Sequence, residues 1–341
     1  MGLAKIFRLA LILVPLSAQA QTMYTVTDLG SLGGTITFVT GVNSSGVAVG
    51  GSTDSSGRLR AFIWKNGVMQ SIEPPEGYTR SLAMGISNSG KVVGRFDNQE
   101  SCQYPNCRHI TFVYDKSVQV LPTLGGTQTQ GYGISNSGYV VGAATSAQSN
   151  MLLRGFVLRK DSIRELGTLG GIFSGAHAVN SRGIAAGYAG VPGPGTSHAA
   201  LFRGDIVEDL GTLGGDRSLA TGINNAGEVV GYSDTTNNEE VRGFVVRKGQ
   251  MYDLGTFGGR DSEAFAINNL SQIVGRAQTS IRSYHAFLHE NGEMIDLNDR
   301  ISDSRWRLVE ATATSDTGII AINSELQGVH NKSVLLTPIV N

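Results

Sequence analysis

Beyond residue 20 the sequence contains no long apolar run, little aromatic content and no excess of basic residues. A membrane-spanning helix needs about 20 consecutive apolar residues, and no later stretch meets that requirement. Of the 27 basic residues, two lie in residues 1–20, which leaves 25 against 28 acidic ones. A nucleic-acid-binding surface needs a basic face. We therefore predict no membrane span and no nucleic-acid partner.

Helical periodicity is also missing. Apolar residues do not recur at i, i+3 and i+4 over any sustained stretch after residue 20, although an amphipathic helix requires that pattern. Glycine, in contrast, is abundant with 46 residues, while aromatic residues make up only 7%. This composition favours short strands joined by many tight turns over helices.

The first 20 residues have the layout of a secretory signal. Lys5 and Arg8 supply a positive start, an apolar run follows, and Ala18-Gln-Ala20 offers a small-residue cleavage site. No cysteine stands directly after the apolar run, so a lipid-anchored form is not expected. We predict cleavage near Ala20 and a chain secreted to the periplasm or to the outside of the cell.

Two short motifs alternate along the rest of the chain. One is Asp209-Leu-Gly-Thr-Leu-Gly-Gly215, which returns in related forms near residues 28, 121, 165 and 253. The other is Gly222-Ile-Asn-Asn-Ala-Gly227, whose seven copies end 44 to 48 positions apart. Those last residues are Gly46, Gly90, Gly138, Gly183, Gly227, Ser271 and Gly318. Strict alternation of two motifs at a nearly fixed period is the signature of a repeat array.

Each repeat contains four short strands. In the fifth repeat we predict them over 219–224, 228–233, 242–247 and 250–254. The first two are joined by a hairpin turn, Asn-Asn-Ala-Gly, whose glycine takes a positive φ. A period of about 40–45 residues with four strands per unit is typical of a β-propeller. The sequence therefore predicts an all-β, seven-bladed β-propeller of four-stranded antiparallel blades.

The predicted domain organisation is a signal peptide over 1–20 and a single propeller domain over 21–341. The seventh repeat ends without a fourth strand, while residues 24–29 form a fourth strand that no repeat precedes. The N-terminal strand is therefore predicted to complete the last blade, which removes an open sheet edge. The closing segment is 21–34, and the blades are 35–77, 78–126, 127–171, 172–215, 216–259, 260–303 and 304–341.

Three motifs together resemble a known family. His285-Ala-Phe287 ahead of a strand, the Asp-Leu-Gly-Thr-Leu-Gly-Gly motif and the Gly-Ile-Asn-Asn-Ala-Gly turn are similar to those of the bacterial HAF-repeat extracellular proteins. The resemblance covers nearly all of the chain after residue 20 and implies an exported repeat protein. It implies no catalytic residues. The tripeptide itself varies in the other repeats, as Arg60-Ala-Phe62, Arg154-Gly-Phe156, His198-Ala-Ala200 and Arg242-Gly-Phe244.

Cys102 and Cys107 are the only cysteines, and both fall in one long connection of the second repeat. In an exported chain a pair of this kind predicts a disulfide. Two free thiols, or a metal site that also uses His109, are the alternatives.

Two polar positions recur once per repeat. His198 and His285 share theirs with arginines of other repeats, and because arginine does not coordinate metals, this position predicts no metal site. The second position is acidic and lies at the end of the fourth strand. Because it recurs in many blades, it predicts hydrogen-bond acceptors at strand ends instead of an acid/base pair. Its members are Asp28, Glu165, Asp209, Asp253 and Asp296.

The connections between strands differ in how much their length varies. The turn between the first and second strands is constant, whereas second-to-third connections include the long segments 97–108, 190–195 and 234–240. These connections share a face with the links between blades; we name it the variable-loop face and the opposite one the constant-turn face. Binding concentrates on variable loops of a rigid scaffold. The ligand-binding residues predicted at its channel mouth are Arg80, Gln130, Arg217, Arg260, Asp261 and Glu263.

These patterns predict an exported, monomeric scaffold that binds a surface glycan, a peptide or an envelope protein through the variable-loop face. One alternative is a secreted glycan-active enzyme, a lyase or hydrolase, with its site at the channel mouth. Another is a purely structural surface protein. An enzyme needs a non-repeated acid/base or metal constellation in one place, and the sequence offers none, so no catalytic residue, cofactor or metal is predicted.

Overall fold

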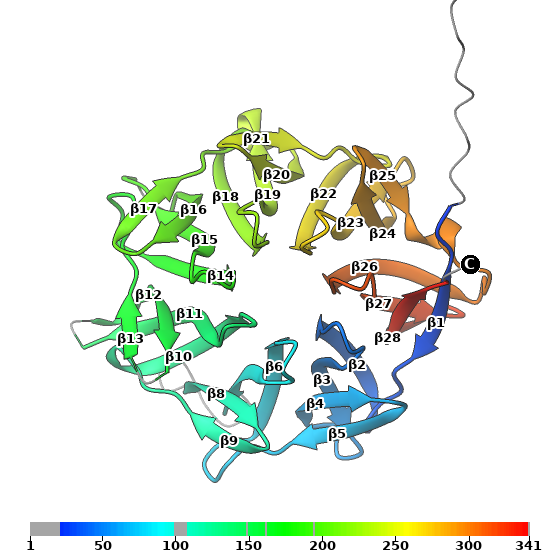
Figure 1. The fold of residues 1–341 in the computed structure, drawn as a ribbon, viewed down its shortest axis with the longest axis horizontal. Helices are drawn as coiled ribbons and strands as arrows, with labels where there is room; N and C mark the ends of the chain where they lie inside the picture. The colour runs from blue at the N-terminus through cyan, green and yellow to red at the C-terminus, as the bar shows by residue number, and fades with distance from the viewer. Residues whose placement is uncertain (1–20, 99–107, 148, 161, 194, 340–341) are drawn as a thin grey trace, which may run out of the picture.

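The computed structural model describes residues 21–98, 108–147, 149–160, 162–193 and 195–339. Within these ranges the chain forms 28 strands and two short 3-10 helices, with no α-helix. The sheets are arranged around a central axis, as Figure 1 shows. The prediction of an all-β chain is confirmed.

Five of the six sheets have four antiparallel strands each. In four of them the strands follow one another in spatial order as they do in the sequence, and the first strand lies nearest to the central axis (Figure 1). These four sheets are β2 (Gly33–Val42), β3 (Ala48–Asp54), β4 (Leu59–Lys65), β5 (Val68–Ile72); β6 (Arg80–Ile86), β7 (Val92–Asp97), β8 (His109–Asp115), β9 (Ser117–Val120); β10 (Gly125–Ile134), β11 (Tyr139–Ser146), β12 (Ser149–Arg159), β13 (Ser162–Glu165); and β22 (Gly258–Ile267), β23 (Ile273–Thr279), β24 (Tyr284–Glu290), β25 (Glu293–Asp296).

The first and last strands of the chain share the fifth four-stranded sheet. Its spatial order is β1 (Tyr24–Asp28), β28 (Val329–Pro338), β27 (Ile320–Leu326), β26 (Trp306–Thr314). β1 and β28 run antiparallel, with Val26 opposite Leu336 and Thr27 opposite Leu335. Tyr24 is buried in a core cluster that also contains Leu308 and Leu336. The two ends of the described chain therefore lie side by side, as Figure 1 also shows.

The sixth sheet has eight strands. Its two halves are each four-stranded and antiparallel, and they are joined at a single parallel residue pair, Ser197 in β16 and Arg217 in β18. The halves are β14 (Ser174–Val179), β15 (Ala185–Gly190), β16 (Ser197–Arg203), β17 (Ile206–Asp209), and β18 (Gly214–Ile223), β19 (Val229–Thr235), β20 (Val241–Arg247), β21 (Gln250–Asp253). The 3-10 helices η2 (Thr236–Asn238) and η3 (Leu297–Arg300) lie in connections.

The strands of the fifth repeat agree well with the predicted ones. β19, β20 and β21 begin and end within two residues of the predicted bounds. β18 begins at Gly214 instead of residue 219, because Gly214 pairs with Thr235 on the far side of a register shift between Gly214 and Ser218. A bulge of this kind lengthens and bends the strand.

The constant turn is held by its own asparagine. Asn224 Oδ1 accepts the Glu228 N–H (3.0 Å), and the Gly227 N–H donates to the Asn224 carbonyl oxygen (3.1 Å). Asn224 Nδ2 donates to the carbonyl oxygen of Asn268 in the next turn (3.3 Å). Gly227 adopts a φ of 90°, and Ser271 at the equivalent position has 61°. The predicted positive φ of this turn position is confirmed.

Apolar cores lie between adjacent sheets. Phe244 on β20 is fully buried in a cluster with Leu201 of the preceding repeat, whereas Val245 belongs to a cluster with Ala264 of the following repeat. Gly231 lies opposite Phe244, and a Cβ at Gly231 would lie 2.8 Å from Phe244 Cζ and 1.9 Å from the Leu219 carbonyl oxygen. Glycine is therefore required there, and the Phe244–Val245 pair packs against both neighbouring repeats.

Buried hydroxyl groups also connect neighbouring repeats. Ser218 Oγ accepts the N–H of Ala199 in the preceding repeat (2.7 Å) and donates to the Gly211 carbonyl oxygen (2.6 Å). Each of these hydroxyls accepts a backbone N–H that has no acceptor in a neighbouring strand. A buried N–H left without an acceptor costs about 1–3 kcal/mol. Equivalent bonds run from Ala61, Thr111, Gly155 and Gly243 N–H to the hydroxyls of Ser81, Thr129, Ser174 and Ser262.

Some predicted features lie outside the described ranges. They are the signal sequence over 1–20 and the cysteines Cys102 and Cys107. The structure therefore gives no support to the predicted Cys102–Cys107 disulfide, and the signal stays a prediction. None of the helices in the described ranges has the length and apolar content that crossing a membrane requires.

Candidate functional site

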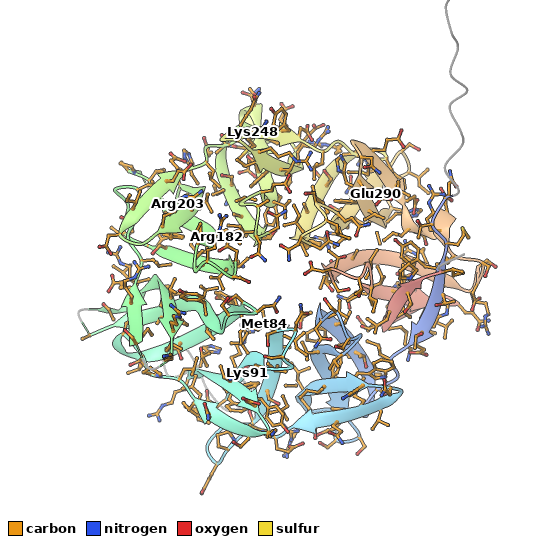
Figure 2. The ribbon with its side chains drawn as sticks, in the orientation of Figure 1. Met84, Lys91, Arg182, Arg203, Lys248 and Glu290 are labelled. Atoms are coloured by element: carbon orange, nitrogen blue, oxygen red, sulfur yellow. The ribbon has the colours of Figure 1, made fainter. Side chains whose placement is uncertain are left out.

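A cavity of about 320 Å³ lies among the innermost strands. Figure 2 shows Met84, one of its lining residues, much nearer to the central axis than Lys248. The cavity lies on the variable-loop side of the constant turns, because its first-strand residues precede those that lead into the turns. Its lining residues are Phe38, Val39, Thr40, Met84, Tyr132, His177, Thr221, Phe265, Glu310, Thr312 and Asn323.

One position of the repeat supplies most of the large side chains of this cavity. It is the residue just before the turn motif's glycine or alanine, and it is Met84, Tyr132, His177 or Phe265 in four repeats. In the other three repeats it is threonine, whose hydroxyl donates to a carbonyl oxygen of the next sheet. These bonds are Thr40 to Ala83 (2.9 Å), Thr221 to Ala264 (2.8 Å) and Thr312 to Val39 (3.0 Å).

Two aromatic rings enclose His177. The Tyr132 ring stacks on His177 with centroids 4.7 Å apart and an interplanar angle of 13°, and Tyr188 lies tilted at 5.9 Å. Burial lowers the pKa of His177 to about 4 and raises the pKa of Tyr132 to about 12. At neutral pH the Tyr132–His177 pair therefore offers uncharged, flat surfaces and the Tyr132 phenol, whose hydroxyl bonds to Gln130 Oε1 (2.8 Å).

Charged groups on the other side of the cavity form a network around Arg276. Its guanidinium bonds to both carboxylate oxygens of Glu263 (3.1 Å each) and to Glu310 Oε2 (3.0 Å), and it lies over the Tyr284 ring at 4.6 Å. Burial alone would lower the pKa of Arg276, but the hydrogen bond and charge of Glu263 and the charge of Glu310 outweigh it and raise that pKa. Asn323 Nδ2 donates to Glu310 Oε1 (3.4 Å). Glu310 and Asn323 are thereby fixed at the cavity wall.

The six residues predicted at the channel mouth lie on four strands: β6, β10, β18 and β22. None of them is among the residues that line the cavity in the described part of the chain. Gln130 bonds to Tyr132, and Glu263 reaches Glu310 through Arg276. Gln130 and Glu263 therefore hold lining residues in place without lining the cavity themselves.

The other four are held by partners outside the cavity. Arg80 Nε lies 3.7 Å from the buried Asp97, and Arg217 Nε bonds to Asp234 (3.2 Å). The Arg260 guanidinium donates to the Glu239 carbonyl oxygen, and Asp261 accepts the Val241 N–H (3.0 Å). The structure therefore does not bring the six together into one constellation, and a ligand-binding role for them stays a prediction.

Four of the five recurring acidic residues have the predicted role. Asp209 Oδ1 accepts the Gly211 N–H (2.8 Å), and Asp28, Asp253 and Asp296 make the equivalent bond. The sequence did not reveal that this position also pairs with the recurring His or Arg position. His285 Nδ1 lies 2.6 Å from Asp296 Oδ2, and Arg154 Nε lies 3.7 Å from Glu165 Oε1.

Sequence reasoning missed the cavity residues themselves. A signal for them was present, since the repeat position of Met84, Tyr132, His177 and Phe265 changes its residue type between repeats. The turn motif right after it stays nearly constant. Aromatic faces beside a fixed carboxylate and amide can hold a small polar molecule by stacking and hydrogen bonds.

No protein-family model matches the sequence, and no curated protein sequence matches it. Solved structures do match in three dimensions. The β-propeller domain of the Trilobed protease from Pyrococcus furiosus gives a TM-score of 0.56 at 10% identity, over 94% of this chain and 98% of that one. Acylaminoacyl peptidase from Pyrococcus horikoshii gives 0.55 at 10% identity, over 85% of this chain and 50% of that one.

TolB from Acinetobacter baumannii is 16% identical, with a TM-score of 0.42 over 62% of this chain and 50% of that one. The chain thus spans about half the length of the TolB and peptidase chains. At these identities the likeness concerns the fold alone. Together with the four-stranded antiparallel sheets, the similarity to the Trilobed protease domain shows that the chain has a β-propeller architecture.

Proposed function

We propose that the protein is an exported, seven-bladed β-propeller that binds a ligand in its central cavity. The blade count is supported by the eight-stranded sheet, whose halves meet at only one residue pair, Ser197 and Arg217. Counted as two blades, these halves bring the total to seven. The pairing of β1 with β28 supports closure of the ring through the N-terminal strand.

Export and family membership belong to the same proposal. The signal-like residues 1–20 support secretion, and the repeated motifs support a place among the HAF-repeat extracellular proteins. An exported protein meets glycans, peptides and envelope proteins, which are the partners that the sequence predicts.

One observation carries the binding function: the large, non-repeated side chains of a single repeat position gather in one cavity of about 320 Å³. If this repeat position served only to join blades, we would expect threonine there in every repeat, as at Thr40, Thr221 and Thr312. Tyr132, His177 and Phe265 supply flat apolar faces, and Glu310 and Asn323 supply polar groups. This combination suits a glycan, whose rings have apolar faces and hydroxyl edges.

The enzyme alternative has less support. The acids nearest to the cavity, Glu263 and Glu310, both bond to Arg276. Because both carboxylates are engaged by the same guanidinium, neither is placed to exchange a proton with a bound ligand, as general acid–base catalysis requires. We therefore favour binding.

A glycan array probed with the purified secreted protein tests this function. We expect Tyr132→Ala and Phe265→Ala to weaken the signal, because each removes a flat face of the cavity. Tyr252→Ala is the matched control, since Tyr252 is an exposed aromatic residue on the outer strand β21. A blank array for the wild type, or equal signals for the cavity and control variants, would contradict the proposal.

A further inference from the structure

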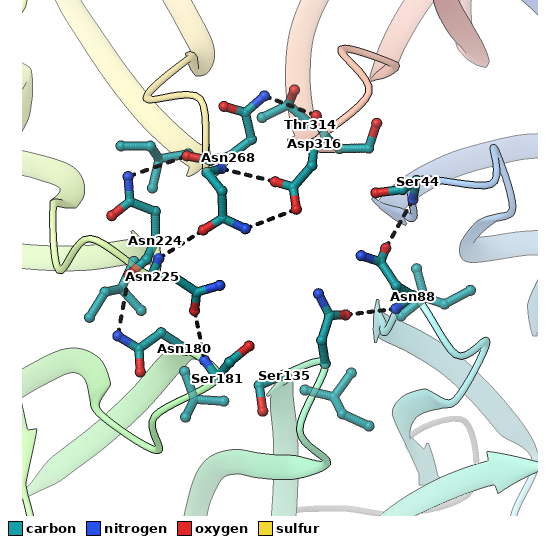
Figure 3. Close-up of a pocket in the computed structure, with 18 of the residues that line it drawn as sticks. Ser44, Asn88, Ser135, Asn180, Ser181, Asn224, Asn225, Asn268, Thr314 and Asp316 are labelled. Carbon is teal, nitrogen blue, oxygen red and sulfur yellow. Dashed lines mark hydrogen bonds between the residues drawn. The ribbon is translucent and has the colours of Figure 1, made fainter.

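A second cavity, of about 190 Å³, opens at the constant-turn face (Figure 3). All seven repeats contribute to its lining, and none of the residues that the structure describes lines both this cavity and the first one. Its polar rim is formed by the second residue of each Asn/Ser pair in the turn motif. These rim residues are Ser44, Asn88, Asn136, Ser181, Asn225, Asn269 and Asp316.

Successive turns are connected around this rim. The backbone N–H of one rim residue donates to the side-chain oxygen of the next one along the chain. The bonds are Ser44 to Asn88 (3.0 Å), Asn88 to Asn136 (2.7 Å), Ser181 to Asn225 (2.9 Å), Asn225 to Asn269 (2.9 Å) and Asn269 to Asp316 (2.9 Å). We name this set of bonds the turn ladder.

The turn ladder determines which atoms are left for a ligand. Because the amide oxygens accept backbone N–H groups, the amide nitrogens of Asn88, Asn136 and Asn225 have no acceptor among the described residues. Figure 3 shows the side chains of Asn88 and Asn225 directed toward the centre of the opening. The rim therefore presents several hydrogen-bond donors to one small space.

The ladder is interrupted where the next rim residue is serine. Ser181 is the rim residue next to Asn136, and Ser44 is the one next to Asp316. Within the described residues, the backbone N–H groups of Asn136 and Asp316 therefore lack the side-chain acceptor that the other rim positions have. A serine side chain is too short to reach across. Two backbone donors are thereby added to the amide donors at the rim.

Asp316 is the only carboxylate of this lining in the described chain. It accepts the backbone N–H of Asn269 (2.9 Å) and its Nδ2 (2.8 Å), so its remaining lone pairs can accept from a ligand. Its negative charge opposes the binding of an anion. Beneath the rim lies an aliphatic layer, contributed by the residue that precedes each turn in most repeats, such as Ile134, Val179 and Ile223.

We propose that this cavity binds one neutral sugar ring that enters from the constant-turn face. Sugar hydroxyls accept hydrogen bonds from the amide and backbone donors and can donate to Asp316, while the C–H face of the ring contacts the aliphatic layer. The volume lies below the about 300–1,000 Å³ of sites for drug-sized ligands, which limits the occupant to a single ring. This site is separate from the cavity of the proposed function and does not depend on it.

Titration calorimetry with methyl glycosides tests the proposal. We expect at least one of the methyl glycosides of glucose, galactose, mannose and N-acetylglucosamine to bind the wild-type protein with a Kd near ~1 mM. Asn88→Asp and Asn136→Asp keep the oxygen that accepts the neighbouring N–H but replace the amide donor. Each should weaken binding by about tenfold, equivalent to about 1.4 kcal/mol.

Two controls separate this site from others. Asn66→Asp makes the same chemical change on an outer hairpin and should leave the affinity unchanged. Phe265→Ala alters only the first cavity and should also leave it unchanged. If Asn88→Asp does not fold, Asn136→Asp and Asn225→Asp provide the same measurement elsewhere on the rim. Absence of binding by all four glycosides, equal affinity in the rim variants, or loss of binding in Phe265→Ala would each overturn the proposal.

Discussion

Thr25 lies directly opposite Thr337 across the β1–β28 ladder, and its hydroxyl donates to the Thr337 carbonyl oxygen (3.3 Å). Both residues are exposed, although 312 positions separate them in the sequence. Directly opposed residues of antiparallel strands have Cα atoms about 4.5–5.5 Å apart, which is within the range of a disulfide. This contact therefore allows a direct test of ring closure.

The double variant Thr25→Cys/Thr337→Cys should form a disulfide in the secreted protein, because the proposed ring holds the two strands together. Peptide mapping by mass spectrometry without reductant would detect the cross-linked peptide. In the control Thr25→Cys/Val329→Cys the second cysteine lies eight residues further along β28, about 27 Å away at 3.4 Å per residue, and should not cross-link. Equal cross-linking in the two variants, or none in either, would contradict closure through β1.

Ser271 occupies a turn position with a positive φ of 61°, which glycine occupies in the other repeats. Its hydroxyl also bonds to Glu228 Oε2, so Ser271→Gly alone would combine two effects. Ser271→Ala and Ser271→Gly both lose that bond, but only glycine relieves the backbone strain. We expect Ser271→Gly to be more stable than Ser271→Ala by about 1 kcal/mol. Equal midpoints of denaturant unfolding would show that the positive φ carries no penalty here.

Arg276 bridges Glu263 and Glu310 through one ion pair to each. Arg276→Met leaves two partly buried carboxylates close together without a counter-charge. We expect the free energy of unfolding to fall by about 2 kcal/mol, a value reduced from that of a fully buried pair because the arginine is partly exposed. The triple variant Glu263→Gln/Arg276→Met/Glu310→Gln should recover much of the loss. A single variant as stable as the wild type in urea would refute this role.

His177 predicts a pH dependence of stability. Its pKa is about 4 in the folded protein because of burial, against about 6.5 for an unperturbed histidine. Between these values the unfolded chain binds a proton that the folded chain does not, so stability falls as pH decreases from about 6.5 to 4. His177→Phe keeps a ring beside Tyr132 and removes this loss, which amounts to at most about 3 kcal/mol. Parallel pH profiles of unfolding for both proteins would contradict the neutral state of the half-buried His177.

Much of the fold could be predicted because local chemistry sets it in each repeat. The turn asparagine, the positive-φ glycine and the aspartate that ends the fourth strand act on backbone groups a few residues away, as Asn224 and Asp209 show. Because the motifs recur along the chain, the same local signal appears several times in the sequence. The alternating motifs also located the N-terminal strand, which pairs with β28 as its position in the repeat suggested.

The candidate site could not be predicted in the same way, because its contacts join residues of different repeats. Tyr132 and His177 stack although 45 positions separate them, and Arg276 meets Glu310 on the following repeat's first strand. Polarity and position near a loop singled out Arg217 and Arg260, but in the structure both bond to groups outside the cavity. The sequence showed which positions vary, and only the fold showed which of them face the axis.

The turn ladder runs in one direction, from the backbone of one turn to the side chain of the next. A copied repeat inserted between two turns would bring one donor and one acceptor, so the ladder would gain a step and leave no group unmatched. A gene for such a chain can therefore grow or shrink by whole repeats through duplication and deletion without damage to this contact. The spacing of 44 residues from Gly183 to Gly227 and again from Gly227 to Ser271 shows that these neighbouring units of the ladder have equal length.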